Sequence, residues 1–546
     1  MGKRNGSGEI FWHKIKSIMK TLQYFNIIVI FFSVFIISKS CTSQENKQSK
    51  KPNILFCIAD DATWRHMSAY GSKWVNTPAF DEVAKQGILF NNAYTPNAKC
   101  GPSRSIILTG RNSWQLEEAA NHLAYFPTKF KTYPEALAEK GYTVGYTGKG
   151  WAPGTALNED GSKRNLLVKA YNKIKKETPT KGINAVDYVS NFKNFLKEKK
   201  DDTPFCFWYG GHEPHRFYEY GTGVSVGKKK LSQINSVFSY WPQSDVVKND
   251  MLDYAFELEY FDKQLGGILK ALEEKGELEN TIIVVTADNG MPFPRVKGLS
   301  YEHSNHMPLA IMWKNGINNP GRVIQDYVSF IDFAATFIDF AGFTNKELGM
   351  QPIQGKSLKP FFTSKKENLI KSKDDYVLLG QERHDVGRPN DVGYPVRGIV
   401  KDGFMYLINY KNDRWPAGNP ETGYTNTDGS PTKTEILELK RSGENNEYWD
   451  LNFGKHPKEE LYQVRIDENC MNNLASNNQF QKIKTELKNI LESELQKQND
   501  PRMFGRGDIF DNYVPDRNVN FYERYMRGEK MKSGWINDTD FEKKKN

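Results

Sequence analysis

Short apolar runs alternate with longer helical patterns from residue 52 to about residue 340. Runs rich in β-branched and aromatic residues predict strands, and amphipathic stretches predict helices. The predicted strands are Asn53–Ala59, Thr143–Thr147, Phe205–Tyr209 and Thr281–Thr286. The predicted helices are Phe80–Gln86, Pro134–Lys140, Val186–Lys200, Met251–Lys275 and Phe330–Ala341. This alternation favours an α/β domain with a mainly parallel sheet.

The pattern changes after roughly residue 395. Two short predicted strands, Arg397–Val400 and Phe404–Asn409, flank a hairpin-like turn at residues 401–403. A polar stretch rich in Gly, Pro and Asn follows from residue 412 to about 447, and Ile483–Gln498 then predicts one amphipathic helix. We therefore expect a main domain over residues 52–395 and a smaller α+β domain over residues 396–546.

The first fifty residues have the pattern of an export signal. Lys14, Lys16 and Lys20 precede an almost unbroken apolar run from Tyr24 to Ile37, and small residues follow it. The run is shorter than the ~20 residues that a membrane-spanning helix needs. We expect a signal peptide over residues 1–40, a polar tether over residues 41–51 and a protein exported to the periplasm. Cys41 either carries a lipid anchor, which we favour, or follows a plain cleavage site at Ser40, and a lipid anchor would be the only link to a membrane.

The net charge of +9 over 546 residues first suggests a partner such as nucleic acid or a membrane surface. However, residues 1–50 contain eight Lys or Arg and two Asp or Glu, a net charge of +6, which leaves +3 for residues 51–546. The chain is 38% hydrophobic and 13% aromatic, which is enough for a large core. We therefore expect a globular protein that does not bind nucleic acid.

Polar clusters directly follow each of the four predicted strands. In open α/β sheets ligands bind at the carboxyl ends of parallel strands, so four separate segments would converge on one crevice. Any one cluster alone is more often a helix cap or a turn, but four together predict a site. The clusters are Asp60 and Asp61, Lys149, His212 and His215, and Asp288 and Asn289.

The carboxylates of Asp60, Asp61 and Asp288 and the amide of Asn289 supply oxygen ligands without thiolates. Such a set suits a hard cation, Ca²⁺ or Mg²⁺, rather than Zn²⁺. The alternative for the His212-x-x-His215 spacing is a zinc pair or two histidines of a turn. A zinc site would need further nitrogen or sulfur ligands.

Residues 100–111, Cys-Gly-Pro-Ser-Arg-Ser-Ile-Ile-Leu-Thr-Gly-Arg, predict a helix that begins near Cys100. Pro102 fits the first turn and Gly110 can end the helix. The helix N-terminus would favour an anion beside Cys100. The alternative is a reactive thiol of lowered pKa, but such a nucleophile wants a neighbouring base, and Arg104 cannot serve as one. Cys57 and Cys206 lie in apolar runs and are expected to be buried.

The Cys-x-Pro-Ser-Arg and Thr-Gly-Arg motifs resemble the signature of the type I sulfatases, whose cysteine is oxidised to formylglycine. The resemblance extends from Pro52 to Ala475 and is greatest to the heparan N-sulfatase (sulfamidase)-like branch, on residues 212–216 and 288–294. It implies an alkaline-phosphatase-like α/β/α sandwich with a large mixed, mainly parallel sheet and a smaller C-terminal α+β domain. Residues 52–395 would be the catalytic domain.

The resemblance also implies the roles of individual residues. One Ca²⁺ would be held by Asp60, Asp61, Asp288, Asn289 and the formylglycine made from Cys100. Arg104 would stabilise the nucleophilic hydroxyl, Lys149 and Lys297 would contact the sulfuryl oxygens, and His215 would protonate the leaving atom. A formylglycine-generating enzyme or an anaerobic sulfatase-maturing enzyme would be a partner during maturation.

One position departs from that family. Many type I sulfatases have Lys-x-His where this chain has Lys149-Gly150-Trp151, and the missing histidine aids expulsion of sulfate. Either another histidine substitutes, with His122 the nearest in sequence, or Trp151 forms a wall of the substrate pocket. Packing of Trp151 in the core is an equal alternative.

The substrate expected from the resemblance is a sulfated polysaccharide, such as ulvan or a glycosaminoglycan, and both O-sulfate and N-sulfate remain open. His212 and the residues after the predicted strand Tyr376–Leu379, namely Arg383, His384 and Arg388, are predicted to bind the sugar. Two other functions remain open at this stage. One is a phosphatase or phosphodiesterase of the same superfamily, and the other is a non-catalytic exported glycan-binding protein in which Cys100 is never converted.

Overall fold

The apolar run of β1 (Asn53–Ala59) forms a fully buried strand of a mixed sheet in the computed structural model, which describes residues 11–23, 50–370, 375–531 and 535–542. Within these residues the sheet has seven strands in the order β4-β6-β1-β7-β8-β2-β9. The four neighbours from β4 to β7 are parallel, and β8 is antiparallel to both β7 and β2. The other strands are β2 (Ile88–Tyr94), β4 (Thr143–Gly148), β6 (Phe205–Gly210), β7 (Thr281–Ala287), β8 (His306–Met312) and β9 (Arg322–Ser329).

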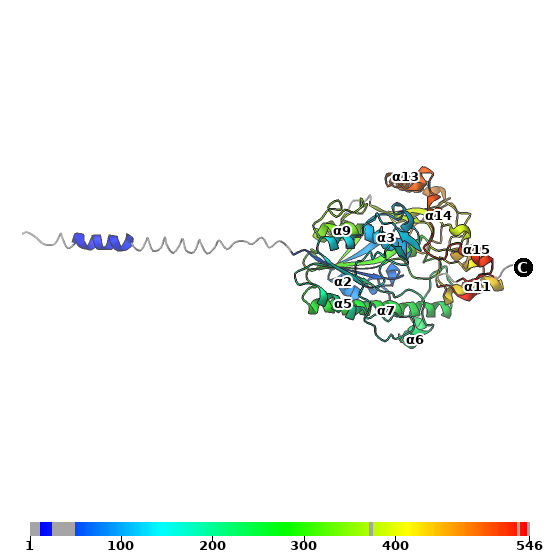
Figure 1. Ribbon diagram of the computed structural model, residues 1–546, viewed down its shortest axis with the longest axis horizontal. Coiled ribbons are helices and arrows are strands. Elements are labelled where there is room, and N and C mark those ends of the chain that lie inside the picture. Colours follow the sequence, from blue (N-terminus) through cyan, green and yellow to red (C-terminus); the bar gives the residue numbers. More distant parts are fainter. Residues whose placement is uncertain (1–10, 24–49, 371–374, 532–534, 543–546) are drawn as a thin grey trace, which may run out of the picture. The chain divides into compact units, whose positions relative to one another are not determined.

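Helices cover both faces of this sheet (Figure 1). One face carries α3 (Cys100–Thr109) and α9 (Asp332–Phe340), with α4 (Tyr133–Glu139) packed beside them. The opposite face carries α2 (Pro78–Lys85), α5 (Tyr188–Glu198) and the long α7 (Asp245–Glu274). The predicted α/β/α sandwich with a mainly parallel sheet is therefore confirmed.

The four predicted strands are all present as neighbours, and three of them extend one residue further than predicted. Strands β2 and β8 were not predicted from the sequence, because β2 carries a bulge between Phe90 and Ala93 and β8 contains Pro308, which interrupt the strand pattern. Helix α7 begins six residues earlier than predicted, at Asp245 after the cap Ser244. The six added residues include Asp245, Asn249 and Asp250, and their polar character conceals the start of the helix in the sequence.

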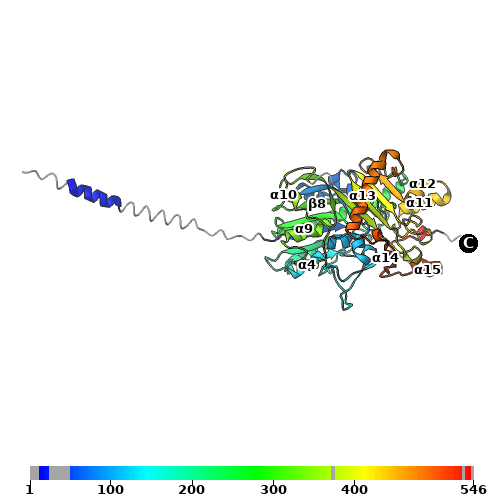
Figure 2. The same ribbon diagram turned by 90° about the horizontal axis from the view of Figure 1, so that it is seen from above.

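A second, antiparallel sheet has the order β10-β11-β12-β13 in the described part of the chain. Its strands are β10 (Tyr376–Gln381), β11 (Val396–Lys401), β12 (Phe404–Asn409) and β13 (Glu459–Tyr462). Helix α13 (Gln481–Lys497) lies on this sheet (Figure 2). Its buried residues Leu487, Leu491 and Leu495 pack in one cluster with residues of the sheet. The division predicted at residues 395 and 396 falls between β10 and β11, and residues 51–546 form one compact unit.

The polar stretch rich in Gly, Pro and Asn contains a helix, α11 (Pro431–Ser442), which returns to the main core. Ser430 caps it, Pro431 occupies its first turn, and Ile436 and Leu437 are buried in the same cluster as β1. The sequence analysis assigned no helix to this stretch, so α11 is an element that it missed. The remaining elements are β3 (Ala124–Phe126), β5 (Gly154–Ala156), α6 (Thr222–Ser225), α8 (Glu302–Asn305), α10 (Lys359–Thr363), α12 (Glu447–Phe453), α14 (Ile509–Asn512) and α15 (Phe521–Met526).

In the N-terminal unit, residues 1–50, the structure describes a helix over residues 11–23. The predicted apolar run and Cys41 lie outside the described residues. No helix that the structure describes has both the length and the apolar character needed to span a bilayer.

Candidate active site

The polar clusters that follow β1, β4, β6 and β7 meet at one end of the sheet because these four strands are parallel neighbours. Carboxylate oxygens of Asp60, Asp61 and Asp288 and the Sγ of Cys100 all lie within 4.8 Å of one another. A ring nitrogen of His215 lies within the same distance of Asp60 and Cys100. The four segments predicted to converge on one crevice therefore do so.

The oxygen atoms of this cluster fit a hard cation. The Nδ2 of Asn289 donates to Asp61 Oδ1 at 2.7 Å, and the buried Oδ1 of Asn289 has no hydrogen-bond partner among the described residues. Three buried carboxylates and an unpartnered amide oxygen are the ligands that Ca²⁺ prefers. The side chains present are therefore compatible with the predicted ion.

Two cations, the buried Arg104 and the part-buried Lys149, lie against the same carboxylates. Arg104 on α3 donates from Nε to Asp288 Oδ2 at 2.8 Å, and Lys149 Nζ lies 2.6 Å from Asp60 Oδ2. Burial alone would raise the pKa of Asp60, but Lys149, His215, Arg104 and Lys297 hold it well below its usual range. Burial raises the pKa of Asp288 to about 6, against the opposing charge of Arg104. Both carboxylates are therefore ionised at neutral pH.

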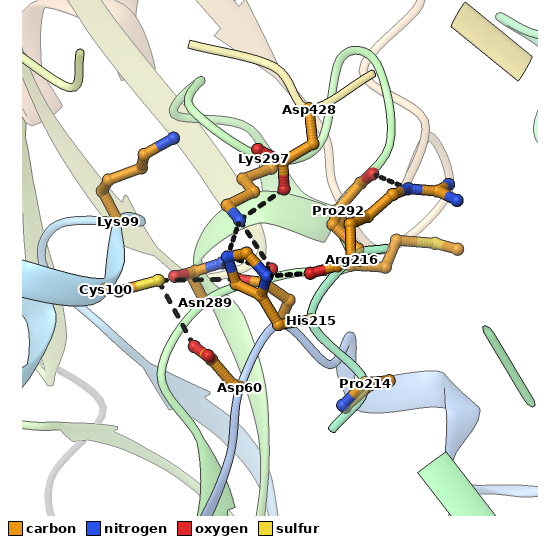
Figure 3. A network of polar contacts seen from close by, with 12 residues as sticks. Asp60, Lys99, Cys100, Pro214, His215, Arg216, Asn289, Pro292, Lys297 and Asp428 are labelled. Carbon is orange, nitrogen blue, oxygen red and sulfur yellow. Dashed lines mark hydrogen bonds and ion pairs between the residues drawn. The ribbon is translucent and has the colours of Figure 1, made fainter. Parts of the chain in front are cut away.

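Lys297 lies at the centre of a second group of contacts (Figure 3). Its Nζ lies 2.6 Å from Asp61 Oδ2, 2.6 Å from Asp428 Oδ2 and 3.1 Å from His215 Nε2. His215 Nδ1 lies 2.6 Å from the carbonyl oxygen of Arg216, which can only accept a hydrogen bond, so Nδ1 carries the hydrogen. The other ring nitrogen, Nε2, then faces Lys297 as an acceptor. Burial, followed by the charge of Lys297, lowers the pKa of His215 to about 4.

Cys100 occupies the first position of α3, and Gly110 ends this helix in the left-handed conformation, as predicted. The Cys100 side chain is buried and its thiol donates to Asp60 Oδ1 at 3.3 Å. Burial and the neighbouring Asp60 carboxylate raise the pKa of the Cys100 thiol well above its usual range. This direction speaks against a reactive thiol of lowered pKa, because burial and the neighbouring carboxylates both disfavour the thiolate.

The two predicted histidines differ in their surroundings. His215 belongs to the cluster with Asp60 and Cys100, whereas His212 belongs to no metal-ligand cluster that the described residues form. Burial lowers the pKa of His212 to about 4, and its backbone N–H donates to the Tyr188 hydroxyl. Among the described residues, no group of three or more ligands contains both His212 and His215, as a zinc site would need.

Trp151 packs against the start of α3, where its Nε1 donates to Ser105 Oγ at 2.7 Å. His122 also lies beside this helix start, since a Cβ on Gly101 would be 3.5 Å from His122 Cδ2. His122 Nδ1 lies 3.8 Å from Asp385 Oδ2, and both ring nitrogens are buried without a hydrogen-bond partner among the described residues. The structure thus brings His122 next to Cys100 from 22 residues further along the chain.

The predicted sugar-binding residues Arg383, His384 and Arg388 are all buried. Arg388 donates to the carbonyl oxygens of Trp415 and Pro416, and Arg383 donates to the Tyr513 carbonyl at 2.6 Å. His384 Nε2 lies 2.6 Å from Asn97 Oδ1. Their role in sugar binding stays a prediction.

Two charged residues of the site were not identified from the sequence. Asp428 lies in the polar stretch rich in Gly, Pro and Asn, and it reaches Lys297 because α11, which follows it, returns to the main core. Lys99 directly precedes Cys100, donates to the Asn426 carbonyl at 2.9 Å and lies 3.8 Å from Asp385. The position of Lys99 next to the motif was the one available signal.

Known proteins are similar to this chain over most of its length. The sulfatase family profile matches residues 52–343, and the profile for the C-terminal part of N-sulphoglucosamine sulphohydrolase matches residues 296–398. An ulvan-active sulfatase of Formosa agariphila is 28% identical over 524 residues, covering 87% of this chain and 82% of that protein. Human N-sulphoglucosamine sulphohydrolase is 26% identical, covering 83% of this chain and 92% of that protein. A solved structure in complex with its substrate D-glucosamine-2-N,6-O-disulfate has a TM-score of 0.58 at 20% identity, covering 83% of this chain and 99% of that one.

Proposed function

Since this chain belongs to the sulfatase family and is a sulfuric ester hydrolase, we propose that it removes sulfate groups from the sugars of ulvan or a glycosaminoglycan. The observation that carries the proposal is the position of Cys100 in its Cys-Gly-Pro-Ser-Arg motif. Its Sγ lies within 4.8 Å of the carboxylates of Asp60, Asp61 and Asp288. The names of two relatives, an N-acetylglucosamine-6-O-sulfatase and an N-sulphoglucosamine sulphohydrolase, support both an O-sulfate and an N-sulfate as the group that is removed.

Asp60, Asp61, Asp288 and Asn289 would hold one Ca²⁺ together with residue 100. When present, Ca²⁺ would supply positive charge to a sulfuryl oxygen, and a formylglycine made from Cys100 would supply the nucleophilic hydroxyl. Lys149 and Arg104 keep the Asp60 carboxylate ionised and ready to bind a cation. Lys149 is part-buried and Lys297 fully buried, so both ammonium groups can interact with a sulfate ester in a site that excludes most water.

His215 would transfer a proton to the leaving oxygen or nitrogen. Its pKa of about 4 makes the ring neutral at pH 7 in the free enzyme. An anionic sulfate beside the ring would favour the protonated form, and Lys297 Nζ at 3.1 Å is a neighbouring proton donor. We expect loss of the His215 side chain to lower kcat more for substrates with poor leaving groups than for substrates with good ones.

Sulfate release from ulvan, heparan and chondroitin oligosaccharides tests the proposal. Protein from a host that makes formylglycine should release sulfate from at least one of these substrates, whereas Cys100→Ala should release none. Mass spectrometry of the peptide that contains residue 100 should show an aldehyde in place of the thiol. An unconverted thiol in an inactive wild-type protein would contradict the proposal and favour a glycan-binding protein.

We also propose that the protein is exported and reaches the periplasm through its N-terminal segment. The charged and apolar pattern of residues 14–37 supports this localisation. A mature protein that begins at residue 41 and carries a lipid on Cys41 is the expected product. N-terminal sequencing and mass spectrometry of protein from the native host would test both statements.

A further inference from the structure

Two exposed aromatic side chains lie together beside His215. Phe217 is 47% exposed and Trp535 is 45% exposed, and their ring centroids are 5.8 Å apart. The Trp535 ring also lies 6.0 Å from the ring of His215. Two large aromatic rings that meet in solvent form an apolar surface that their own contacts do not cover.

This pair lies where the buried cluster meets solvent. A ring nitrogen of His215 is within 4.8 Å of Cys100 Sγ, while the His215 side chain is 19% exposed. One side of the imidazole therefore belongs to the buried cluster and the other neighbours Trp535. His215 therefore joins the buried cluster around Cys100 to the exposed ring of Trp535.

Phe217 is held by the residue that precedes it. Arg216 donates both terminal guanidinium nitrogens to the Asp250 carboxylate, at 2.6 Å and 2.9 Å, and its Nε donates to the Pro292 carbonyl. Arg216 and Asp250 are both buried. A bidentate buried ion pair of this kind fixes the backbone that carries Phe217.

Trp535 is held by the segment that follows it. Its carbonyl accepts from the Gly429 N–H, the neighbouring Ile536 is buried, and Asp540 Oδ2 lies 3.2 Å from Lys433 Nζ in a fully buried ion pair. Gly429 permits this close approach, because a Cβ there would lie 2.7 Å from the Asn537 nitrogen. Gly429 directly follows Asp428, so the C-terminal segment is joined to the loop that contacts Lys297.

The two anchors are connected through one carboxylate. Asp250 Oδ2 accepts from Arg216 and also from the Thr432 hydroxyl at 2.6 Å, in the first turn of α11. Phe217 and Trp535 thus project from backbone segments that share a buried support. Preorganisation of this kind reduces the entropy lost when a ligand binds.

We propose that Phe217 and Trp535 form a platform for the pyranose ring next to the sugar whose sulfate is cleaved. The C–H face of a sugar ring is apolar and stacks on flat aromatic rings, while its hydroxyl and acidic groups stay in water. The platform adjoins His215, whose Nε2 lies 3.1 Å from the cation Lys297, and this charge suits a sulfated chain. Two side chains are too few for a protein interface, which buries about 800 Å² on each partner. The inference rests on the proposed function and makes the C-terminal segment a determinant of substrate length.

The test compares oligosaccharide and monosaccharide substrates for Trp535→Ala and Phe217→Ala. Each variant should raise KM for a sulfated oligosaccharide about tenfold, equivalent to about 1.4 kcal/mol. The change in kcat should stay within twofold. On the matching monosaccharide sulfate, the ratio of the variant KM to the wild-type KM should be close to one. Trp535→Phe, which keeps a flat ring, should restore most of the loss. Phe504→Ala removes a ring that is 49% exposed elsewhere and is the matched control.

A binding measurement separates the platform from the chemistry. Cys100→Ala protein should bind the oligosaccharide, and adding Trp535→Ala should weaken that binding by a similar factor in calorimetry. An active wild-type enzyme whose oligosaccharide KM is unchanged in both aromatic variants would overturn the platform and leave the sulfatase proposal intact. An inactive wild-type protein whose oligosaccharide binding depends on Trp535 would support the platform and contradict the sulfatase proposal. Equal KM increases for the oligosaccharide and the monosaccharide would also overturn the platform. Unchanged melting temperatures would verify that the variants fold.

Discussion

The carboxylates of the site are balanced by cations at the scale of single residues. Asp60 contacts Lys149, Asp288 contacts Arg104, and Lys297 lies between Asp61 and Asp428. Four carboxylates thus face three permanent cations, which leaves one negative charge for a metal ion to offset. Ionised groups can remain buried here because each has a partner of opposite charge.

Replacing His122 and replacing Trp151, the two residues beside the start of α3, should affect kcat and stability differently. His122→Ala should lower kcat by about 10–100-fold, because its two unpartnered ring nitrogens are available for proton transfer next to Cys100. Trp151→Phe should lower kcat less than threefold while costing about 1 kcal/mol of stability, through the lost hydrogen bond to Ser105. Steady-state kinetics and thermal melts distinguish these results. If Trp151→Phe lost more activity than His122→Ala, Trp151 would contact the substrate instead.

Asp428 should be needed to hold Lys297. Lys297 and His215 keep the pKa of Asp428 well below its usual range, although burial opposes them, so the group is ionised at neutral pH. Asp428→Asn keeps the shape but removes the charge, which lets Lys297 Nζ move toward Asp61. We expect kcat/KM to fall about tenfold or more, a loss of at least about 1.4 kcal/mol of transition-state binding. Asp413→Asn, an exposed aspartate, is the control and should retain wild-type kcat/KM.

At the scale of elements, the sheet topology determines the site more than any single motif. The order β4-β6-β1-β7 places four polar strand ends side by side, and α3 adds Cys100 and Arg104. Helix α11 then adds the loop with Asp428 and supports Trp535 through Gly429. Each element therefore contributes one or two groups, and none contains a complete site.

Helix α2 is capped by a residue of another helix, which predicts a pH dependence of stability. Asp262 on α7 accepts from the backbone N–H groups of Ala79 and Phe80, yet burial raises its pKa to about 7. The folded protein then binds a proton that the unfolded chain has already lost, so this group's contribution to stability falls as pH rises from about 4 to 7.

Asp262→Asn should remove that dependence. The free energy of unfolding of the wild type should fall relative to the variant by about 1–3 kcal/mol over this pH range. Urea unfolding at pH 5 and pH 7.5 measures the difference. A constant difference at both pH values would show that Asp262 titrates normally.

At the scale of the whole molecule, a bound cation should stabilise the fold because its ligands come from separate segments. Asp60 and Asp61 follow β1, while Asp288 and Asn289 follow β7, more than 200 residues along the chain. Ca²⁺ at 100 times its Kd would add about 2.7 kcal/mol to the free energy of unfolding. We expect millimolar Ca²⁺ to raise the melting temperature by a few degrees and a chelator to reverse the effect and abolish sulfate release. Asp288→Asn should lose the Ca²⁺ response, and a response retained in that variant would contradict the assignment.

The central strands and the cluster around Cys100 were predicted well from the sequence, because both depend on the types and spacing of residues that are close together in the chain. An apolar run such as Asn53–Ala59 is buried on both faces, and a polar pair at its end marks the edge of a parallel sheet. The motif from Cys100 to Gly110 specifies its own helix through a proline in the first turn and a left-handed glycine at the end. These residues could be identified without knowing what they contact.

The partners of those residues could not be predicted, because long-range packing decides them. Asp428 belongs to a polar stretch whose helix α11 is stable only through its contact with α7 and the main core. Arg383 and Arg388 lie in a segment whose charged residues are typical of a binding loop, but both donate to backbone carbonyls. Nothing in the local pattern separates a buried arginine that supports a loop from one that faces a ligand.

The sequence by itself thus determined the α/β architecture, the oxygen-rich cluster and the position of Cys100 at a helix start, since these depend on periodicity and on residue types at strand ends. Only the tertiary structure decided that Lys297 is shared by Asp61 and Asp428, that His122 lies beside Gly101, and that Trp535 meets Phe217 at the exposed side of His215. Each of these contacts joins segments that are far apart in the chain or in separate elements. Their geometry follows from the packing of the core and of the C-terminal segment against it, which local patterns do not encode.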